Sequence, residues 1–291
     1  PLSMAIYFRA TGTRSLFGSA CKLSMKLLQV GNAKTSSDET HCICTFISHN
    51  VIHSTCEVIS ELSYPAFKEY FVFLKTFMLE RIDNIARARE NAYYQSKWVH
   101  TGCERVCTSL DKLLMLCLCT HDIQFFSLLK LSIKAHAFEA LATENGIHCY
   151  HNSLAESFSD VMGDDVVFTG FVSLHKKFKS ILADFEPTKG LYEAWVIIYG
   201  RWMEMIDNMT GLDDDTFTFK HYTEFLSTTS GCFLRGKISE TRIGDQEAAK
   251  DLISSFYDRA VSLLDCEELF IRVVIREALS AETHPDVYRL I

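Results

Sequence analysis

The sequence predicts an all-α protein, a single helical bundle of about ten helices. Prolines, which interrupt helices, number four in 291 residues, and only Pro65 and Pro187 lie away from the ends of the chain. Apolar residues recur at spacings of three and four, the period of an amphipathic helix. The polar breaks between these patterns are short, which favours antiparallel neighbours in a bundle.

The first three helices are expected between residues 16 and 94. Leucines indicate the first helix, and the stretch 46–62 indicates the second. Pro65 can occupy the first turn of the third helix, which should end near Tyr94. The leucines of the first helix are Leu16, Leu23, Leu27 and Leu28. The apolar stripe of the third is Phe67, Tyr70, Phe71, Leu74, Phe77, Met78 and Ile82, with Glu80, Arg81, Asp83 and Arg87 to its side.

The rest of the chain continues in the same way. Helical patterns cover 99–119, 123–143, 150–162, 166–185, 191–209 and 217–226. Gly211 to Asp215 indicates a turn, and 228–244 is the longest loop-like segment. One or two closing helices are expected within 247–279.

Two parts of the chain differ in composition. Residues 1–45 are expected to be a basic N-terminal segment, and residues 46–282 a single helical domain. The first 37 residues contain five lysines and arginines but no Asp or Glu, the composition of an organelle transit peptide. A basic amphipathic helix packed on the domain has the same composition, so both interpretations stay open.

Net charge, hydropathy and cysteine content exclude several classes of protein. A net charge of -8 gives no basic footprint for nucleic acid. The longest apolar run, Leu113 to Cys119, is far too short for a membrane span. Eleven cysteines is an odd count, and no secretory signal accompanies it, so we expect reduced thiols. The sequence therefore predicts an intracellular, reducing location, either mitochondrion or cytoplasm, without nucleic acid or membrane span.

A cluster of histidines and cysteines between residues 41 and 56 suggests metal ligands. Its members are His41, Cys42, Cys44, His49, His53 and Cys56. Their spacing matches no closed zinc pattern, because no second cysteine pair follows at a fixed distance. Glycine-rich phosphate loops, GxSxG and HExxH are absent from the sequence. We therefore predict no metal site and no cofactor.

Residues 191–209 carry the most distinctive pattern. Tyr192, Trp195 and Tyr199 fall at helical positions i, i+3 and i+7, with Trp202 one turn further. Stripes with this spacing are most often core. Buried Tyr and Trp nevertheless carry polar atoms, and Gly200 would let another element approach the backbone closely. A pocket for a small aromatic ligand is the alternative.

The stretch "YEAWVIIYG" (192–200) resembles the Y-x-x-W-I-x-x-Y-G helix of the TenA (thiaminase II) family, which has the haem-oxygenase-like helical fold. Stretches at 53–79, 134–147, 173–182 and 256–270 follow the order of that family, so the resemblance covers about 50–275. It implies a pocket lined by aromatic and polar side chains. The candidate pocket residues are Phe77, Tyr150, His175, Tyr199 and Glu267.

The residues that would perform thiaminase chemistry are replaced. The resemblance places Leu74 where the family has a pyrimidine-binding Asp, and Leu174 where it has the nucleophilic Cys. Such chemistry needs a thiolate and a carboxylate, which leucine cannot supply. We therefore expect no catalytic residue, and a non-catalytic or diverged TenA-like domain with protein partners, such as an accessory subunit of a mitochondrial assembly.

Two alternatives stay open. One is a small-molecule enzyme of the same fold, for thiamin-pyrimidine salvage or a related reaction, with its site relocated to Tyr150, His175, Tyr199 and Glu267. The other is an unrelated helical bundle with globin-like connections.

Overall fold

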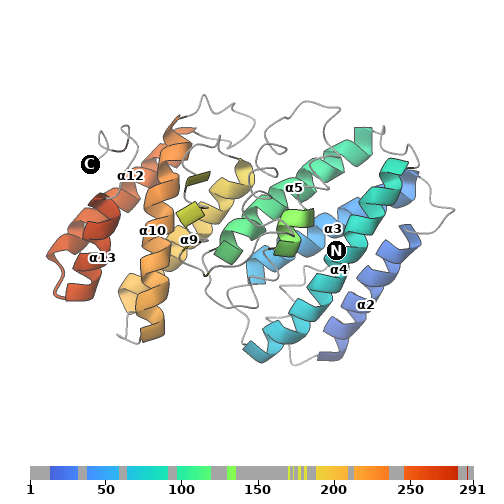
Figure 1. Cartoon of the computed structure of the whole chain (residues 1–291), viewed down its shortest axis with the longest axis horizontal. Coiled ribbons are helices and arrows are strands. Elements are labelled where there is room, and N and C mark those ends of the chain that lie inside the picture. Colours follow the sequence, from blue (N-terminus) through green and yellow to red (C-terminus); the bar gives the residue numbers. More distant parts are fainter. Residues whose placement is uncertain are drawn as a thin grey trace. The chain divides into compact units, whose positions relative to one another are not determined.

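The structure is a computed structural model, and a defined part of the chain is described in it. The described residues are 14–31, 38–58, 64–90, 97–118, 130–135, 188–208, 213–235 and 246–280, with residues 170, 173, 176, 177, 180, 181 and 287. Every regular element within them is a helix (Figure 1), so the prediction of an all-α protein is confirmed. None of these helices combines the length and apolar character that a membrane span requires.

Contacts divide the chain into two compact units. Unit 1 consists of residues 1–117 and 122–167, and unit 2 of residues 118–121 and 168–291. The domain expected over 46–282 thus contributes to both units, and each unit is described below by itself.

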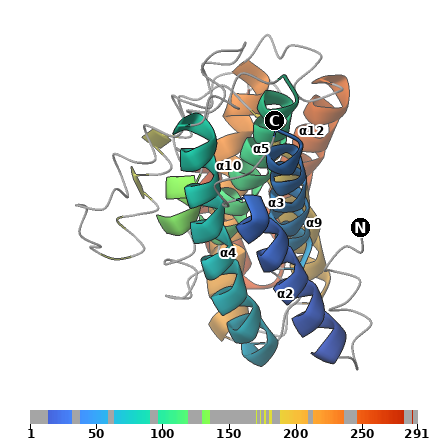
Figure 2. The ribbon, with the colours of Figure 1, turned by 90° about the vertical axis from the view of Figure 1, so that its right-hand side faces the viewer.

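Unit 1 contains four long described helices, and residues 130–135 are helical as well. The four long helices are α2 (Arg14–Gly31), α3 (Asp38–Val58), α4 (Tyr64–Glu90) and α5 (Lys97–Leu118). Helix α2 packs against both α3 and α4 (Figure 2). Its side chains Cys21 and Leu28 are buried. The segment expected over 1–45 thus contains α2 and the beginning of α3, so helical packing starts well before residue 46.

Helix α4 follows its predicted apolar stripe closely. Pro65 is its second residue, as expected for a proline in a first helical turn. The stripe residues Tyr70, Leu74, Phe77, Met78 and Ile82 are buried. Arg81 is wrongly predicted on the polar side, because it is only 2% exposed. It lies three residues after Met78 and four after Phe77, which places it on the stripe itself.

Unit 2 contains α9 (Lys189–Asn208), α10 (Asp213–Arg235), α12 (Gln246–Ser262), the 3-10 helix η2 (Leu263–Asp265) and α13 (Leu269–Ser280). Helix α10 packs against α9, α12 and α13. Thr188 precedes α9 and caps it: the Leu191 N–H donates to Thr188 Oγ1 at 3.2 Å. The Tyr192 N–H donates to the Thr188 carbonyl at 3.1 Å.

Helix α10 corrects two sequence predictions. The short helix expected over 217–226 extends from Asp213 to Arg235, so much of the expected loop 228–244 is helical. In the hydroxyl-rich stretch the side chains bond carbonyls of the preceding turn: Thr229 Oγ1 donates to the Phe225 carbonyl at 2.7 Å. The following residues Cys232 and Phe233 are buried, and this burial stabilises the extension.

A buried hydroxyl joins α12 to α10. The Tyr257 hydroxyl donates to the Ser227 carbonyl at 3.2 Å and lies 2.7 Å from Ser230 Oγ. Ser230 Oγ in turn donates to the Ser227 carbonyl at 2.9 Å. All three side chains are buried, so these bonds satisfy polar atoms inside the core of unit 2.

Candidate functional site

The aromatic side chains of α9 form one stacked row in unit 2. The Tyr199 ring lies 5.4 Å from that of Trp195 and 6.1 Å from that of Trp202, with interplanar angles of 21° and 23°. On α12, Phe256 meets all three rings edge-on, with its centroid 5.1 Å from that of Trp202. On α10, Phe219 stacks on Trp202 at 5.9 Å. Each ring of the row therefore has aromatic neighbours from another helix.

Both indole N–H groups of this row are bonded to the protein. Trp195 Nε1 donates to the Leu226 carbonyl at 3.2 Å, and Trp202 Nε1 donates to Thr223 Oγ1 at 2.8 Å. The Thr223 hydroxyl donates onward to the Phe219 carbonyl at 2.8 Å. Both tryptophans are fully buried. The polar atoms that could recognise a ligand at these positions are therefore used in holding α9 to α10.

No described part of the chain lies close to the α9 backbone at Gly200. A Cβ added at this glycine would meet no described atom within 4 Å, and the residue is exposed. No described element approaches the backbone at Gly200, and an approach by a ligand stays a prediction. The stacked row behaves as core, as the commoner interpretation of its spacing predicts.

Tyr199 is the member of the row that is only partly buried. Burial raises the pKa of its phenol above the ordinary value of 10.0, and the nearby positive charge of Arg259 partly lowers it. Arg259 itself pairs with Asp207 at 3.9 Å. A phenol with a raised pKa stays protonated at neutral pH, so Tyr199 can donate a hydrogen bond but cannot act as a phenolate base.

Tyr199 is expected to make the protein sensitive to alkali. Because its folded-state pKa lies above the unfolded value, its contribution to stability is complete below pH 10 and is lost as the pH rises through the folded pKa. Urea unfolding between pH 8 and 11 should therefore show a steeper loss for the wild type than for Tyr199→Phe. Parallel curves for the two proteins would contradict this assignment.

The predicted pocket residues are not brought together by the described structure. Phe77 is buried in α4 of unit 1, where its ring lies 5.6 Å from that of Phe73. Leu74, at the position of the family's Asp, is fully buried in the same helix. Tyr150, Leu174 and His175 lie outside the described residues.

Glu267 belongs to unit 2, as Tyr199 does, but it is exposed in the turn between η2 and α13. Its backbone carbonyl accepts a hydrogen bond from Arg272 Nη1 at 3.1 Å. No contact between Glu267 and Tyr199 occurs among the residues that the structure describes. The described geometry thus assembles a site neither from Phe77 nor from Glu267.

A buried polar centre between α3 and α4 was missed in the sequence. Arg81 Nη1 donates to Asn84 Oδ1 at 2.9 Å, and Arg81 Nη2 donates to Thr45 Oγ1 at 3.1 Å. Thr45 Oγ1 donates to the His41 carbonyl at 2.8 Å. The available signal was the position of Arg81 on the apolar stripe rather than beside it. A charge held this way commonly has a structural role, because removing it leaves buried partners unsatisfied.

Helix α5 contributes further buried polar groups to unit 1. Asp111 and Lys112 are buried within an otherwise apolar run. Ser109 Oγ lies 3.0 Å from His49 Nδ1 of α3, and the Cys56 thiol lies 3.6 Å from the Ser109 carbonyl. An Asp-Lys pair inside an apolar run was the signal in the sequence. The interior of unit 1 is therefore more polar than the stripe pattern predicts.

The cysteines and histidines of 41–56 face different neighbours. The Cys44 thiol lies 3.6 Å from the Leu27 carbonyl, whereas the Cys56 thiol points to Ser109. His53 is exposed and stacks on His49 at 5.6 Å. Within the described ranges, no three His, Cys, Asp or Glu residues gather as metal ligands would. The Cys44 and Cys56 thiols thus contact backbone carbonyls of α2 and α5.

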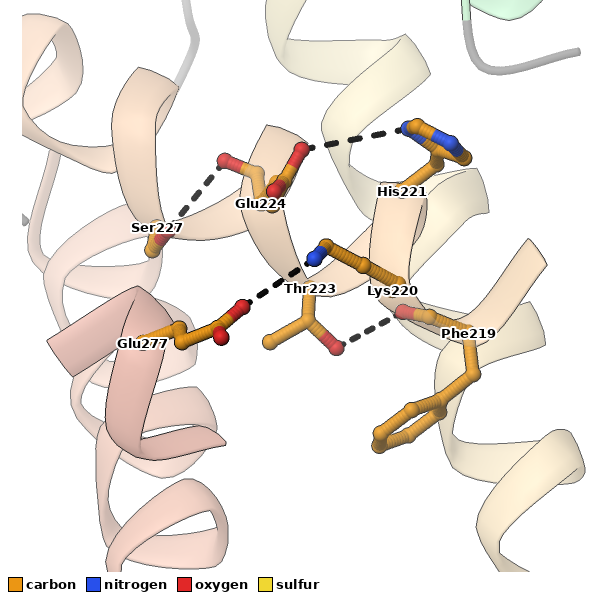
Figure 3. A network of polar contacts seen from close by, with 7 residues as sticks. All are labelled: Phe219, Lys220, His221, Thr223, Glu224, Ser227 and Glu277. Carbon is orange, nitrogen blue, oxygen red and sulfur yellow. Dashed lines mark hydrogen bonds and ion pairs between the residues drawn. The ribbon is translucent and has the colours of Figure 1, made fainter. Parts of the chain in front are cut away.

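Helix α10 carries several polar contacts, one of them with α13 (Figure 3). Lys220 Nζ reaches Glu277 Oε2 of α13 at 3.1 Å, and His221 Nδ1 lies 3.8 Å from Glu224 Oε2. The ring of His221 meets that of Phe217 edge-on at 4.5 Å. Lys220 and Glu277 are exposed, so their ion pair contributes little to stability. The Lys220–Glu277 pair joins α10 to α13, whereas both contacts of His221 lie within α10.

Among the described residues, the two indole N–H groups and the Tyr257 hydroxyl are hydrogen-bonded, whereas Asn84 Nδ2 and Arg259 Nε are buried without a hydrogen-bond partner. The TenA resemblance continues to rest on the residues quoted for it: no family model matches this sequence, and neither does any curated protein compared with it.

Proposed function

We propose that this chain is a non-catalytic, diverged TenA-like helical protein that works as a binding component of a protein assembly. The observation that carries the proposal is that the stacked rings Trp195, Tyr199 and Trp202 of α9 are packed and bonded within unit 2. The two indole N–H groups are bonded inside unit 2, and the rings pack on Phe219 and Phe256. An aromatic wall around a small molecule would instead present polar atoms to the ligand.

The buried Leu74 supports the same proposal. At the position where the resemblance places a carboxylate, the side chain is apolar and fully buried in unit 1. The basic, acid-free composition of residues 1–37 supports an accessory subunit of a mitochondrial assembly as the specific form of this proposal, in which α2 is retained because it packs on α3 and α4.

The experiment has a ligand arm and a partner arm. In the first, the full chain is titrated calorimetrically with thiamin, its aminopyrimidine, its thiazole and haem, and incubated with thiamin to measure turnover. We expect neither binding nor turnover. In the second, the tagged chain is purified from its own cells, and we expect at least one stoichiometric protein partner.

Submicromolar binding of any of these ligands, or turnover of thiamin, would defeat the proposal. Its enzymatic alternative, with a site at Tyr150, His175, Tyr199 and Glu267, would then take its place. Purification of the chain as a monomer without partners would equally contradict the binding role.

A further inference from the structure

Helix α2 carries a second apolar face that points away from unit 1. Cys21 and Leu28 are buried against α3 and α4. Leu23 and Val30 are each 59% exposed, and Leu27 is 37% exposed. We call Leu23, Leu27 and Val30 the α2 seam. These residues are four and three positions apart, so they lie on one side of the helix.

The spacing of the α2 seam is that of a coiled-coil helix. Leu23, Leu27 and Val30 follow one another in steps of four and three. Alternating steps of four and three are the a and d positions of a heptad. Such a line of side chains buries its surface when a second helix packs along it.

All charged residues of α2 have one sign. Lys22 and Lys26 are exposed; Lys26 directly precedes Leu27 on the flank of the seam, and Lys22 lies one turn before it. Helix α2 contains Arg14 as its third charged residue and no Asp or Glu. Lys26 occupies a g-type position next to the a and d residues, where charges select the partner helix.

Two exposed apolar side chains also lie on the neighbouring helix α3. Ile43 and Phe46 are 52% and 54% exposed. The Cys44 thiol lies 3.6 Å from the Leu27 carbonyl, so the Cys44 side of α3 is the side that meets α2. Phe46 is two positions from Cys44 and faces away from α2, so it does not extend the α2 seam.

We propose that the α2 seam docks an amphipathic helix of a partner protein. Apolar a and d residues of that helix meet Leu23, Leu27 and Val30, and its acidic residues face Lys22 and Lys26. The inference rests on the proposed binding role and assigns the surface and the chemistry of the partner. A second copy of α2 is a poor occupant, because it would bring lysines against lysines without an acid on either helix.

The probe is a synthetic peptide of three heptads with Leu at a and d and Glu at e and g. A matched peptide has Lys in place of every Glu. Fluorescence anisotropy measures the binding of each to the full 291-residue chain at low and at high salt. We expect the acidic peptide to bind at least about tenfold more tightly than the lysine peptide, with the difference shrinking as salt is added.

Three variants localise the binding. Leu23→Ser with Val30→Ser should weaken the acidic peptide by at least about tenfold. The matched control is Val72→Ser with Leu79→Ser, which removes two exposed apolar side chains from α4 and should change affinity by less than about twofold. Lys22→Glu with Lys26→Glu should reverse the preference between the two peptides.

Cys21 reports whether α2 stays packed in these variants. Burial raises the pKa of its thiol to about 12, so iodoacetamide near pH 8 should alkylate it slowly. Peptide mapping by mass spectrometry measures this rate. Slow alkylation in the seam variants shows that any loss of binding comes from the altered surface and not from a detached helix.

Several results would overturn the inference. The inference fails if the two peptides bind equally well, or if the Leu23→Ser, Val30→Ser variant binds the acidic peptide as tightly as the wild type does. It also fails if the chain binds phosphatidylserine vesicles in place of the acidic peptide, or if the wild type is a homodimer and this variant is a monomer. If a native partner co-purifies equally with the seam variant, this inference fails while the proposed binding role stands. Ligand turnover would instead defeat the proposed role itself.

Discussion

Replacing Trp202 with alanine is expected to destabilise the protein by about 3–5 kcal/mol, the range for removing a buried aromatic side chain. Trp202 is fully buried, stacks on Phe219 and meets Phe256 edge-on. Its removal also takes away the N–H that Thr223 Oγ1 accepts. Urea unfolding followed by far-UV circular dichroism measures the change in free energy.

Two further variants make this result specific. Trp202→Phe keeps a ring but loses the hydrogen bond, and should cost less than the alanine variant. Val196→Ala lies on the exposed side of the same helix and should change stability by no more than about 0.5 kcal/mol. A loss below about 1 kcal/mol for Trp202→Ala would show that the aromatic row is not core.

Replacing Arg81 with methionine is expected to destabilise the protein by about 2–4 kcal/mol. Methionine is similar in length, so most of the packing is kept while the guanidinium donors are lost. Asn84 Oδ1 then loses the bond from Nη1, and Thr45 Oγ1 loses the bond from Nη2, both within a buried site. The measurement is again urea unfolding, with hydrogen exchange of α3 and α4 to localise the loss.

The matched control is Arg87→Met, on the same helix but exposed. Its expected effect is within about 0.5 kcal/mol, because surface substitutions rarely exceed that. Equal stability of the wild type and Arg81→Met would show that methionine packing fully replaces the buried charge, as happens at some buried ion pairs.

Local spacing predicted much of the fold. The α4 stripe and the α9 aromatic row are visible because both repeat at helical period over several turns. Arg81 could not be placed by this reasoning, because a charged residue is expected on the solvent side unless partners are known. Its partner Thr45 lies 36 residues away, beyond the reach of a local pattern.

Helix α10 was underestimated for a related reason. Serines and threonines compete for backbone hydrogen bonds and are common in loops, so 228–244 resembled a loop. The extension is stabilised by contacts with distant residues: the Phe233 ring lies 5.6 Å from that of Tyr192 and 6.5 Å from that of Trp195. Phe77 could not be related to Tyr199, because the two belong to different units. Phe77 and Tyr199 were each placed correctly only as members of their own helical stripes.

The hydrogen bonds of the Tyr257 hydroxyl fix the position of α12 along the axis of α10. Apolar ridges can slide past one another by a turn and meet equivalent grooves, so they define such a position weakly. If α12 slid along α10, the Tyr257 hydroxyl would lose Ser227 and Ser230 and would be buried among apolar side chains without a hydrogen bond. Such an unsatisfied hydroxyl costs about 1–3 kcal/mol of folding free energy. One polar atom thereby makes competing arrangements of the same two helices unfavourable.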